Sequence, residues 1–195
     1  MELSHVELEG PNVRLEPLDL SRHWDGLLAI GLEPELWRYT AAQINNAEDL
    51  DRYLRRALQE RDQMISAPFA IHHVPSGRIA GCTRFGSIEP SHKRVEIGWT
   101  WVGKPFQRTI VNTETKHLLF QHVFETWGWN RVELKTSALN HKSKAAMRRL
   151  GLVEEGTLRR HMVNEDGTLR DTVYFSVIRE EWPEMKARLE GLLAR

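Results

Sequence analysis

The sequence predicts an α+β fold, with a central, mixed and mostly antiparallel sheet of about seven strands and helices on both faces. Three observations predict this fold. Amphipathic helical segments occur early, in the middle and late in the chain, three β-runs follow one another at its centre, and a strand–helix–strand unit comes next. Because 195 residues with 41% hydrophobic content can bury a sizeable core, we expect one domain over residues 1–195.

The N-terminal part of the chain predicts one strand and two helices. Residues 13–18 alternate between apolar and polar and contain a proline, which is typical of an edge strand. A helix is expected over residues 21–30 with Ser21 as its cap. Asn46 precedes a better helix, in which Asp49 completes a capping box. Its apolar stripe consists of Leu50, Leu54, Ala57 and Leu58.

The middle of the chain predicts a hairpin and a third strand. The hairpin strands are residues 69–74 and 78–85, joined by a turn at Pro75-Ser-Gly77, and residues 94–102 follow as the next strand. A helix over residues 113–127 then leads to a strand over residues 131–136. Since a connection of this kind is right-handed and joins parallel strands, the sheet is mixed from here on.

The C-terminal part continues with a helix over residues 140–150, which Gly151 ends. Two β-runs then flank the turn Asn164–Gly167, and the last strand covers residues 172–178. A charged helix is expected from Glu180 onward.

Composition excludes several classes of function. Lys+Arg and Asp+Glu both total 27, which argues against nucleic-acid and membrane partners, and the absence of a leader-like start predicts a cytosolic protein. The single cysteine, Cys82, excludes an internal disulfide and the usual cysteine-based zinc sites. His72 and His73 are adjacent, but a strand would point them to opposite faces, so no metal site is expected.

The strand over residues 94–102 carries the first chemically suggestive pattern. Strict alternation puts Arg94, Glu96, Gly98 and Thr100 on one face and Val95, Ile97, Trp99 and Trp101 on the other. A glycine beside a carboxylate leaves space for a ligand, and Glu96 could accept a proton directly or through water. The alternative is a solvent-facing carboxylate paired with Arg94.

The loop and helices after this strand carry the second pattern. Lys104 and Arg108 lie just before a helix, and the N–H groups of residues 108–113 suit a pyrophosphate; alternatively, Asn112 or Thr113 simply caps that helix. In the later unit Asn140 caps a helix and Ser143 lies one turn further on. An asparagine amide could also bind a peptide-like ligand, and a serine hydroxyl could stabilise a leaving group.

Taken together, these segments resemble the GCN5-related N-acetyltransferase superfamily, in particular its branch of ribosomal-protein alanine N-acetyltransferases. The resemblance runs from Val13 to about Trp182. It rests on four segments in order: Val95-Glu-Ile-Gly-Trp99, Asn112-Thr-Glu114, Asn140-x-x-Ser143-x-x-Ala146 up to Gly151, and Asp166-Gly167 with Arg170-Asp171-Thr-Val-Tyr174.

The resemblance implies acetyl-CoA as donor and a primary amine, of a protein N-terminus or a small molecule, as acceptor. The amine would attack the thioester directly after Glu96 removes its proton through water, with His161 or a water chain as the alternative base. A backbone N–H near Trp101 or Val102 would meet the oxyanion, and Ser143 would stabilise the thiolate. The implied cofactor-binding residues are Trp101, Val102, Gln107, Arg108, Thr109, Ile110, Val111, Asn112, Thr113, Asn140 and Ser143.

The cofactor turn departs from the superfamily pattern, because Ile110 and Asn112 stand where small residues are usual. We expect a modified turn rather than a lost site, since backbone N–H groups persist whatever the side chain. The alternative is a non-catalytic acyl-CoA-binding or interaction module on the same fold. The acceptor stays open among several amines, with Trp24, Trp37 and Tyr39 as possible pocket residues, and the resemblance also implies a possible homodimer.

Overall fold

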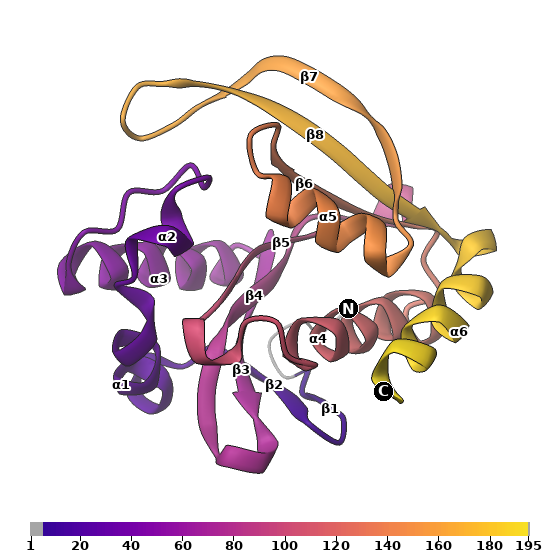
Figure 1. The fold of residues 1–195 in the computed structure, drawn as a ribbon, viewed down its shortest axis with the longest axis horizontal. Helices are drawn as coiled ribbons and strands as arrows, with labels where there is room; N and C mark the ends of the chain where they lie inside the picture. Colours follow the sequence, from indigo (N-terminus) through magenta and orange to yellow (C-terminus); the bar gives the residue numbers. More distant parts are fainter. Residues whose placement is uncertain (1–5, 195) are drawn as a thin grey trace.

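The computed structural model describes residues 6–194, whose strands form a single eight-stranded sheet (Figure 1). The order across the sheet is β1-β2-β3-β4-β5-β6-β8-β7. Only the β5–β6 pair is parallel, as the crossover rule predicts, and the other pairs are antiparallel. The strands are β1 (Leu8–Glu9), β2 (Val13–Pro17), β3 (Ser66–His73), β4 (Arg78–Glu89), β5 (Arg94–Val102), β6 (Arg131–Ser137), β7 (Val153–Val163) and β8 (Leu169–Ile178).

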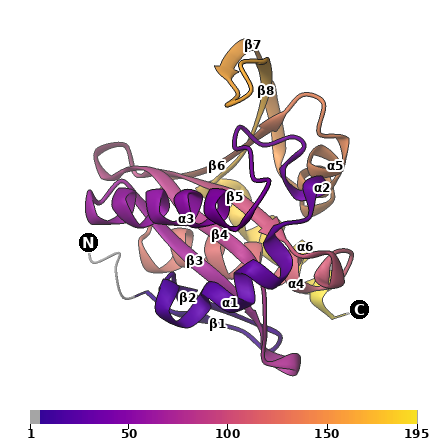
Figure 2. The same ribbon diagram turned by 90° about the vertical axis from the view of Figure 1, so that its left-hand side faces the viewer.

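Helices cover both faces of this sheet (Figures 1 and 2). They are α1 (Leu20–Gly31), α2 (Pro34–Trp37), α3 (Ala47–Asp62), α4 (Val111–Gln121), α5 (His141–Leu150) and α6 (Trp182–Leu193). The first three pack on one face, around a cluster that includes Leu27, Leu54 and Cys82. The last three bury the opposite face, with Phe85 and Ile97 in that larger cluster. Within residues 6–194, none of the helices combines the length and apolar character needed to span a membrane.

The predicted α+β class is confirmed, with differences at the edges of elements. The sheet has eight strands rather than about seven because β1, of two residues, pairs with β2 and is too short to leave a sequence pattern. Asp19, not Ser21, caps α1: its carboxylate accepts the Ser21 N–H. α4 begins at Val111, two residues before the expected start at 113, and continues as a π-helical turn, His122–Thr126.

The capping box expected at α3 is shifted by one residue. Asn46 does cap the helix, since its side chain accepts the Asp49 N–H at 2.9 Å. The Asp49 carboxylate returns to the N–H of Asn45 at 3.0 Å instead of that of Asn46. Two donors at the helix start are thus satisfied, as in a capping box, with one extra residue enclosed.

A β-bulge in β5 changes which residues share a face. Trp99 has a left-handed φ of 48°, and Trp99 and Thr100 together oppose the single residue Thr83 of β4. The predicted alternation therefore holds only up to Gly98. Beyond it, Thr100 turns toward α4, and Trp101 turns to the α1–α3 face, where its ring centroid lies 5.5 Å from that of Trp37.

β5 and β6 separate soon after they begin. Their parallel pairing joins Arg94 to Arg131, Val95 to Val132 and Glu96 to Glu133, and it stops there. β5 continues to Val102 and β6 to Ser137, so the last part of each strand lacks the other as a partner. We call this opening the fork. It leaves one edge of β5 with backbone groups directed toward it rather than toward a neighbouring strand.

Glu114 ties the N-terminal segment to α4. Its buried carboxylate accepts hydrogen bonds from the N–H and side-chain amide of Asn12, both at 2.9 Å, and from the N–H of Val13 at 3.3 Å. We expect Glu114→Gln to lower the free energy of unfolding by about 2–4 kcal/mol, because a charged acceptor of three buried donors becomes a neutral amide that is itself partly a donor. Urea unfolding measures the loss.

The matched control for this prediction is Glu190→Gln, because Glu190 is exposed on α6. Its unfolding free energy should stay within about 0.5 kcal/mol of the wild type. Equal losses in the two variants would mean that the Glu114 bonds add nothing to stability beyond the removal of a negative charge.

Candidate functional site

Glu96 lies beside the fork and is held from one side. It is 5% exposed, so the expectation of a solvent-facing carboxylate is wrong. Its Oε2 atom accepts hydrogen bonds from Lys135 Nζ at 2.8 Å and from Ser87 Oγ at 3.2 Å. Arg94 pairs instead with Glu89 and Glu133. The arrangement fixes the carboxylate through Oε2 and leaves Oε1 for another partner.

Gly98 gives Glu96 its space. A Cβ atom at position 98 would lie 2.9 Å from Glu96 Oε1, closer than real Cβ contacts occur. The glycine was expected to let a ligand approach the backbone, whereas in the structure the carboxylate itself occupies part of that room. Gly98 therefore sets the orientation of Glu96 as well as leaving one side of it free of side-chain atoms.

The bulge residue Trp99 forms a flat wall next to Glu96. The guanidinium of Arg84 lies 4.6 Å from the Trp99 ring centroid and Lys135 Nζ lies 5.8 Å from it. Arg84 is itself buried and paired with Glu60 at 2.7 Å. Trp99 is 38% exposed, in contrast to the buried side chain that strict alternation predicts. A partly exposed indole with cationic neighbours suits contact with an incoming substrate.

The turn before α4 presents backbone donors without a side-chain cap. Ile110 occupies the N-cap position, and neither Asn112 nor Thr113 caps the helix, so that alternative is wrong. Thr109 Oγ1 accepts the Val111 N–H at 3.3 Å, while the N–H groups of Asn112 and Thr113 belong to the first turn and have no carbonyl within the helix to accept them. Donors of this kind, at the positive end of a helix, favour a phosphate.

The non-glycine residues of this turn adopt a backbone that accommodates them. Ile110 has φ −65° and ψ −22°, a helical conformation that does not require glycine. The left-handed residue is Arg108, with φ 61°. Lys104 and Arg108 are both exposed, and the Thr113 hydroxyl is already engaged by Arg149 at 3.0 Å. The side chains of Ile110 and Asn112 thus add bulk without changing the path of the chain.

The end of β5 distinguishes between the two predicted oxyanion donors. The N–H of Gly103 donates to Ala80 O on β4 at 2.8 Å. Because successive N–H groups of a strand point in opposite directions, the N–H of Trp101 also points toward β4 and that of Val102 points toward the fork. The Val102 carbonyl is on the fork side too, where Gln107 Nε2 donates to it at 2.9 Å. Val102 is therefore the better placed of the two donors.

Asn140 and Ser143 lie where β6 ends and α5 begins. Asn140 Oδ1 accepts the Ser143 N–H at 3.0 Å, so the capping role is confirmed. The cap uses only the oxygen of the amide, and the NH₂ group keeps its donors. Ser143 is partly exposed in the first turn of α5. Since β5 and β6 run parallel, the ends from which α4 and α5 follow lie at the same edge of the sheet.

The β7–β8 hairpin reaches across to the segment before α3 (Figure 1). At its tip the N–H of Glu165 donates to Ala41 O at 2.9 Å, and the Glu165 carboxylate accepts the Gln43 N–H at 2.7 Å. We call these two hydrogen bonds the clasp. Tyr174 of β8 pairs in register with Lys135, which places it on the Glu96 face, and His161 stacks edge-to-face on it with centroids 5.7 Å apart.

The aromatic residues suggested for the acceptor pocket belong mainly to the core. Trp37 is 5% exposed, donates from Nε1 to Gly31 O at 2.7 Å and packs against Tyr53 and Trp101. Trp24 is partly buried against the same cluster. Tyr39 is partly exposed and contacts the guanidinium of Arg38. The structure therefore places Trp37 in the packed core and not in a pocket.

Lys116 is a buried cation that the sequence pattern did not single out. It is 5% exposed and donates from Nζ to Thr100 Oγ1 at 2.7 Å, and Thr100 in turn pairs with Thr83 at 2.7 Å. Burial lowers the pKa of Lys116 to about 7. The helical spacing of α4 would have revealed its inward direction, but nothing in the sequence indicates that its polar partner, within the described residues, is a hydroxyl at the bulge.

Glu16, His23 and His72 form a cluster with the composition of a metal site, but hydrogen bonds already occupy both ring nitrogens of His23. His23 Nδ1 accepts the Asp19 N–H at 3.1 Å, so its Nε2 carries the proton and donates to Glu16 at 3.2 Å. No lone pair on that nitrogen faces the cluster. Burial lowers the pKa of His23, while the bond from His23 and the nearby cations outweigh burial and lower the pKa of Glu16.

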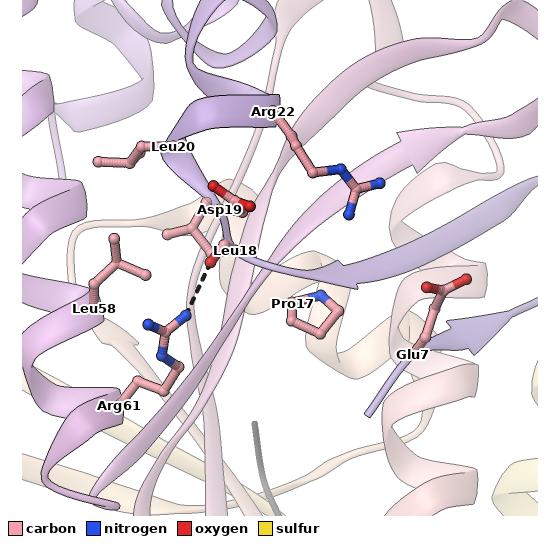
Figure 3. A pocket seen from close by; sticks show the side chains of 8 residues that line it. All are labelled: Glu7, Pro17, Leu18, Asp19, Leu20, Arg22, Leu58 and Arg61. Carbon is pink, nitrogen blue, oxygen red and sulfur yellow. Dashed lines mark hydrogen bonds between the residues drawn. The ribbon is translucent and has the colours of Figure 1, made fainter. Parts of the chain in front are cut away.

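A polar hollow of about 560 Å³ opens at another place on the molecule, between the end of β2 and the helices α1 and α3 (Figure 3). Both arginines that line it are already engaged: Arg61 donates to Leu18 O at 3.1 Å and forms an ion pair with Asp62, and Arg22 pairs with Glu16. β2 is separated from β5 by two strands, so this hollow is distinct from the site around Glu96. Its engaged arginines and open shape do not indicate a substrate pocket.

Known proteins share both the sequence pattern and the fold. The family model of the acetyltransferase (GNAT) domain matches residues 12–153. A curated relative from Bacillus subtilis (strain 168), named "Putative ribosomal N-acetyltransferase YdaF", is 30% identical over 106 residues, which span 54% of this chain and 57% of that protein. The chain thus covers little more than half the length of this relative.

Solved structures cover more of the chain. A GCN5-related N-acetyltransferase from Brucella melitensis superposes with a TM-score of 0.90 at 30% identity, covering 97% of this chain and 86% of that one. A structure from T. thermophilus, described as a "putative acetyltransferase", gives a TM-score of 0.87 at 37% identity over 96% of both chains. The strand that forks after Glu96, the uncapped turn before α4 and these matches agree, and the chain belongs to the GNAT acetyltransferase family, whose cosubstrate is acetyl-CoA.

Proposed function

We propose that this protein transfers the acetyl group of acetyl-CoA to the primary amine of a protein N-terminus. The observation that carries the proposal is the fork, because it brings a held carboxylate, a free strand-edge N–H and two helix starts to one end of the sheet. The donor fits the family, and the acceptor is suggested by the name of the Bacillus subtilis relative.

In this proposal Glu96 prepares the amine. Lys135 and Ser87 occupy Oε2, so Oε1 takes the proton of the ammonium group through a water on the Gly98 side. The neutral amine then attacks the thioester carbonyl and forms the C–N bond. The C–S bond then breaks, and the surplus proton of the nitrogen goes to the departing thiolate. Cys82 forms no acyl-enzyme, since it is buried under α1 and α3 and its burial raises the pKa of its thiol to about 11.

The other residues stabilise charge as it moves. The Val102 N–H lies on the fork side of β5 and donates to the developing oxyanion. Ser143 stabilises the departing thiolate, and the free NH₂ group of Asn140 holds the peptide-like arm of the donor. The N–H groups of residues 108–113 hold the pyrophosphate, assisted by Lys104 and Arg108.

Binding of the donor is the first measurement, because Ile110 and Asn112 add bulk at the turn. Acetyl-CoA at about one hundred times its Kd should raise the Tm by about 5–10 °C. S-acetylpantetheine, which lacks the pyrophosphate, should bind at least about tenfold more weakly, because it cannot use the turn. Isothermal titration gives both affinities.

Ile110→Gly serves as the variant control for this experiment. Since Ile110 already has helical dihedral angles, its replacement should change the acetyl-CoA Kd only slightly. Absence of any thermal shift with acetyl-CoA would refute donor binding. Binding without thiol release across N-terminal peptides and small amines would favour a non-catalytic acyl-CoA-binding module.

A further inference from the structure

Arg170 on β8 is a partly buried cation that forms no ion pair within residues 6–194. Its Nε atom is fully enclosed and has no hydrogen-bond acceptor among the described residues. Other guanidinium groups around the site are neutralised, as in the Arg84–Glu60 pair at 2.7 Å and the Arg131–Glu155 pair. A partly buried guanidinium without an anion costs free energy, and a ligand carboxylate that pairs with its charge would offset that cost.

Arg170 lies on the same face of the sheet as Glu96. Tyr174 pairs in register with Lys135, which binds Glu96, and Arg170 precedes Tyr174 by four residues on β8, which keeps both on one face. Burial lowers the pKa of Arg170, and the charge of Glu96 opposes that shift. The two groups therefore interact electrostatically, although Glu96 forms its ion pair with Lys135 instead.

The distance along the strand indicates what can fit between these two groups. Glu133, the register partner of Glu96, pairs with Ser176, and Arg170 lies six residues further along β8. Six residues of strand span about 20 Å, which the two long side chains shorten from both ends. The two groups are thus offset along the strands and form no ion pair with each other, and an acceptor chain, at about 3.5 Å per peptide residue, could extend from one to the other.

We infer that Arg170 binds a carboxylate side chain near the N-terminus of the acceptor, so that the preferred acceptor is a peptide with Asp or Glu as its second or third residue. This inference rests on the proposed function, of which it specifies the substrate class. The amine lies at Glu96 and the acidic side chain reaches Arg170, which offers a planar pair of donors to a carboxylate. Arg170 is thus a specificity residue that does not touch the reacting atoms.

The test compares matched acceptors that differ in one charge. Amidated peptides X-Glu-Ala-Phe and X-Gln-Ala-Phe, with X as Ala, Ser, Thr or Met, are acetylated by the wild type and by Arg170→Gln. We expect kcat/KM to favour the Glu peptide about ten- to a hundredfold in the wild type, as for a hydrogen bond to a charged group, and the ratio to fall close to one in the variant. Arg170→Lys should keep part of the preference, since it keeps the charge and loses the planar fork.

Arg159→Gln is the matched control, because Arg159 is an exposed arginine on the same hairpin. Its Glu-to-Gln ratio should equal that of the wild type. An equal loss on both peptides in Arg170→Gln would indicate a structural role and overturn the inference. A second result would also overturn the inference: a wild-type kcat/KM that is higher for free alanine than for alaninamide but equal for the two peptides. The recognised carboxylate would then be that of a free amino acid.

A binding measurement separates this inference from the proposed function. Nα-acetylated Glu and Gln peptides are titrated into the CoA-loaded protein, which requires no catalysis. Tighter binding of the Glu peptide that Arg170→Gln abolishes supports the inference even if no amine is acetylated, a result that would refute only the proposed function. Equal binding of the two peptides by the wild type overturns the inference.

Discussion

Replacing Glu96 with glutamine is expected to lower kcat by about 10²–10⁴-fold, the usual contribution of a positioned general base. Glutamine has nearly the same shape, but its amide does not take a proton from the ammonium group. The affinity for acetyl-CoA should stay close to the wild-type value, because Glu96 is not among the groups proposed to hold the donor. Steady-state thiol release and isothermal titration measure the two quantities.

Glu133→Gln is the control for this experiment. Glu133 is the register partner of Glu96 on β6, but it pairs with Arg94 and Arg131 at the end where the strands are still joined. Its kcat should remain near that of the wild type. If Glu96→Gln keeps wild-type turnover at every pH, the base lies elsewhere, and His161, close to Tyr174, is the next residue to replace.

Replacing Lys116 with methionine is expected to stabilise the protein. Burial lowers the pKa of Lys116 from 10.5 to about 7, which corresponds to a cost of about 4 kcal/mol at pH 7. Methionine fills similar space without that cost, although Thr100 loses a hydrogen bond worth about 1 kcal/mol. A net gain of about 2–3 kcal/mol in the free energy of unfolding should appear in urea titrations at pH 7.

The gain in unfolding free energy from Lys116→Met should decrease as the pH rises. The unfolded chain binds the Lys116 proton up to pH 10.5 and the folded chain only up to about pH 7, so wild-type stability rises through this window. The advantage of Lys116→Met is therefore full below pH 7 and shrinks toward pH 10. Lys142→Met, at an exposed position on α5, should change stability little at any pH. Destabilisation by Lys116→Met at all pH values would contradict the prediction.

A stabilising change at Lys116 should nevertheless reduce activity. Lys116 holds Thr100, whose hydroxyl also bonds Thr83 and Gly98, and these residues surround the bulge that redirects Trp101 and Val102. Loosening the bulge would move the Val102 N–H away from the position that we propose for the oxyanion, and thiol-release kinetics would show a lower kcat. Lys116 thus lowers the stability of the fold while it holds the β5 bulge in place, a balance that is common at functional sites.

Local patterns predicted most of the fold. The bounds of β5 follow from its composition, and Gly128 and Gly151, which end helical segments, have the left-handed φ values of 63° and 104° that such ends use. The face assignment failed beyond Gly98 because a bulge adds one residue to a strand without a distinctive local sequence. β1 was missed because its two residues are held by pairing with β2 rather than by their own pattern.

The candidate site was predictable only in part, because its partners come from distant segments. Glu96, Asn140 and the turn before α4 are recognisable from neighbouring residues. The Lys135–Glu96 pair joins residues 39 apart, and the clasp joins Gln43 to Glu165 across 122 positions. Contacts of this range depend on how the sheet twists and on how far the β7–β8 hairpin extends, which periodicity does not encode.

The clasp also closes a ring of chain between Gln43 and Glu165. Starting from Gln43, the path runs through α3 and the sheet to β8 and returns through Glu165, and within residues 6–194 the two hydrogen bonds of the clasp complete this ring. The bond between Gln43 and Glu165 is exposed, so the ring can open by local unfolding without unpacking the core. The exchange rate of the Gln43 and Glu165 amide hydrogens would therefore report how often the β7–β8 hairpin separates from the segment before α3.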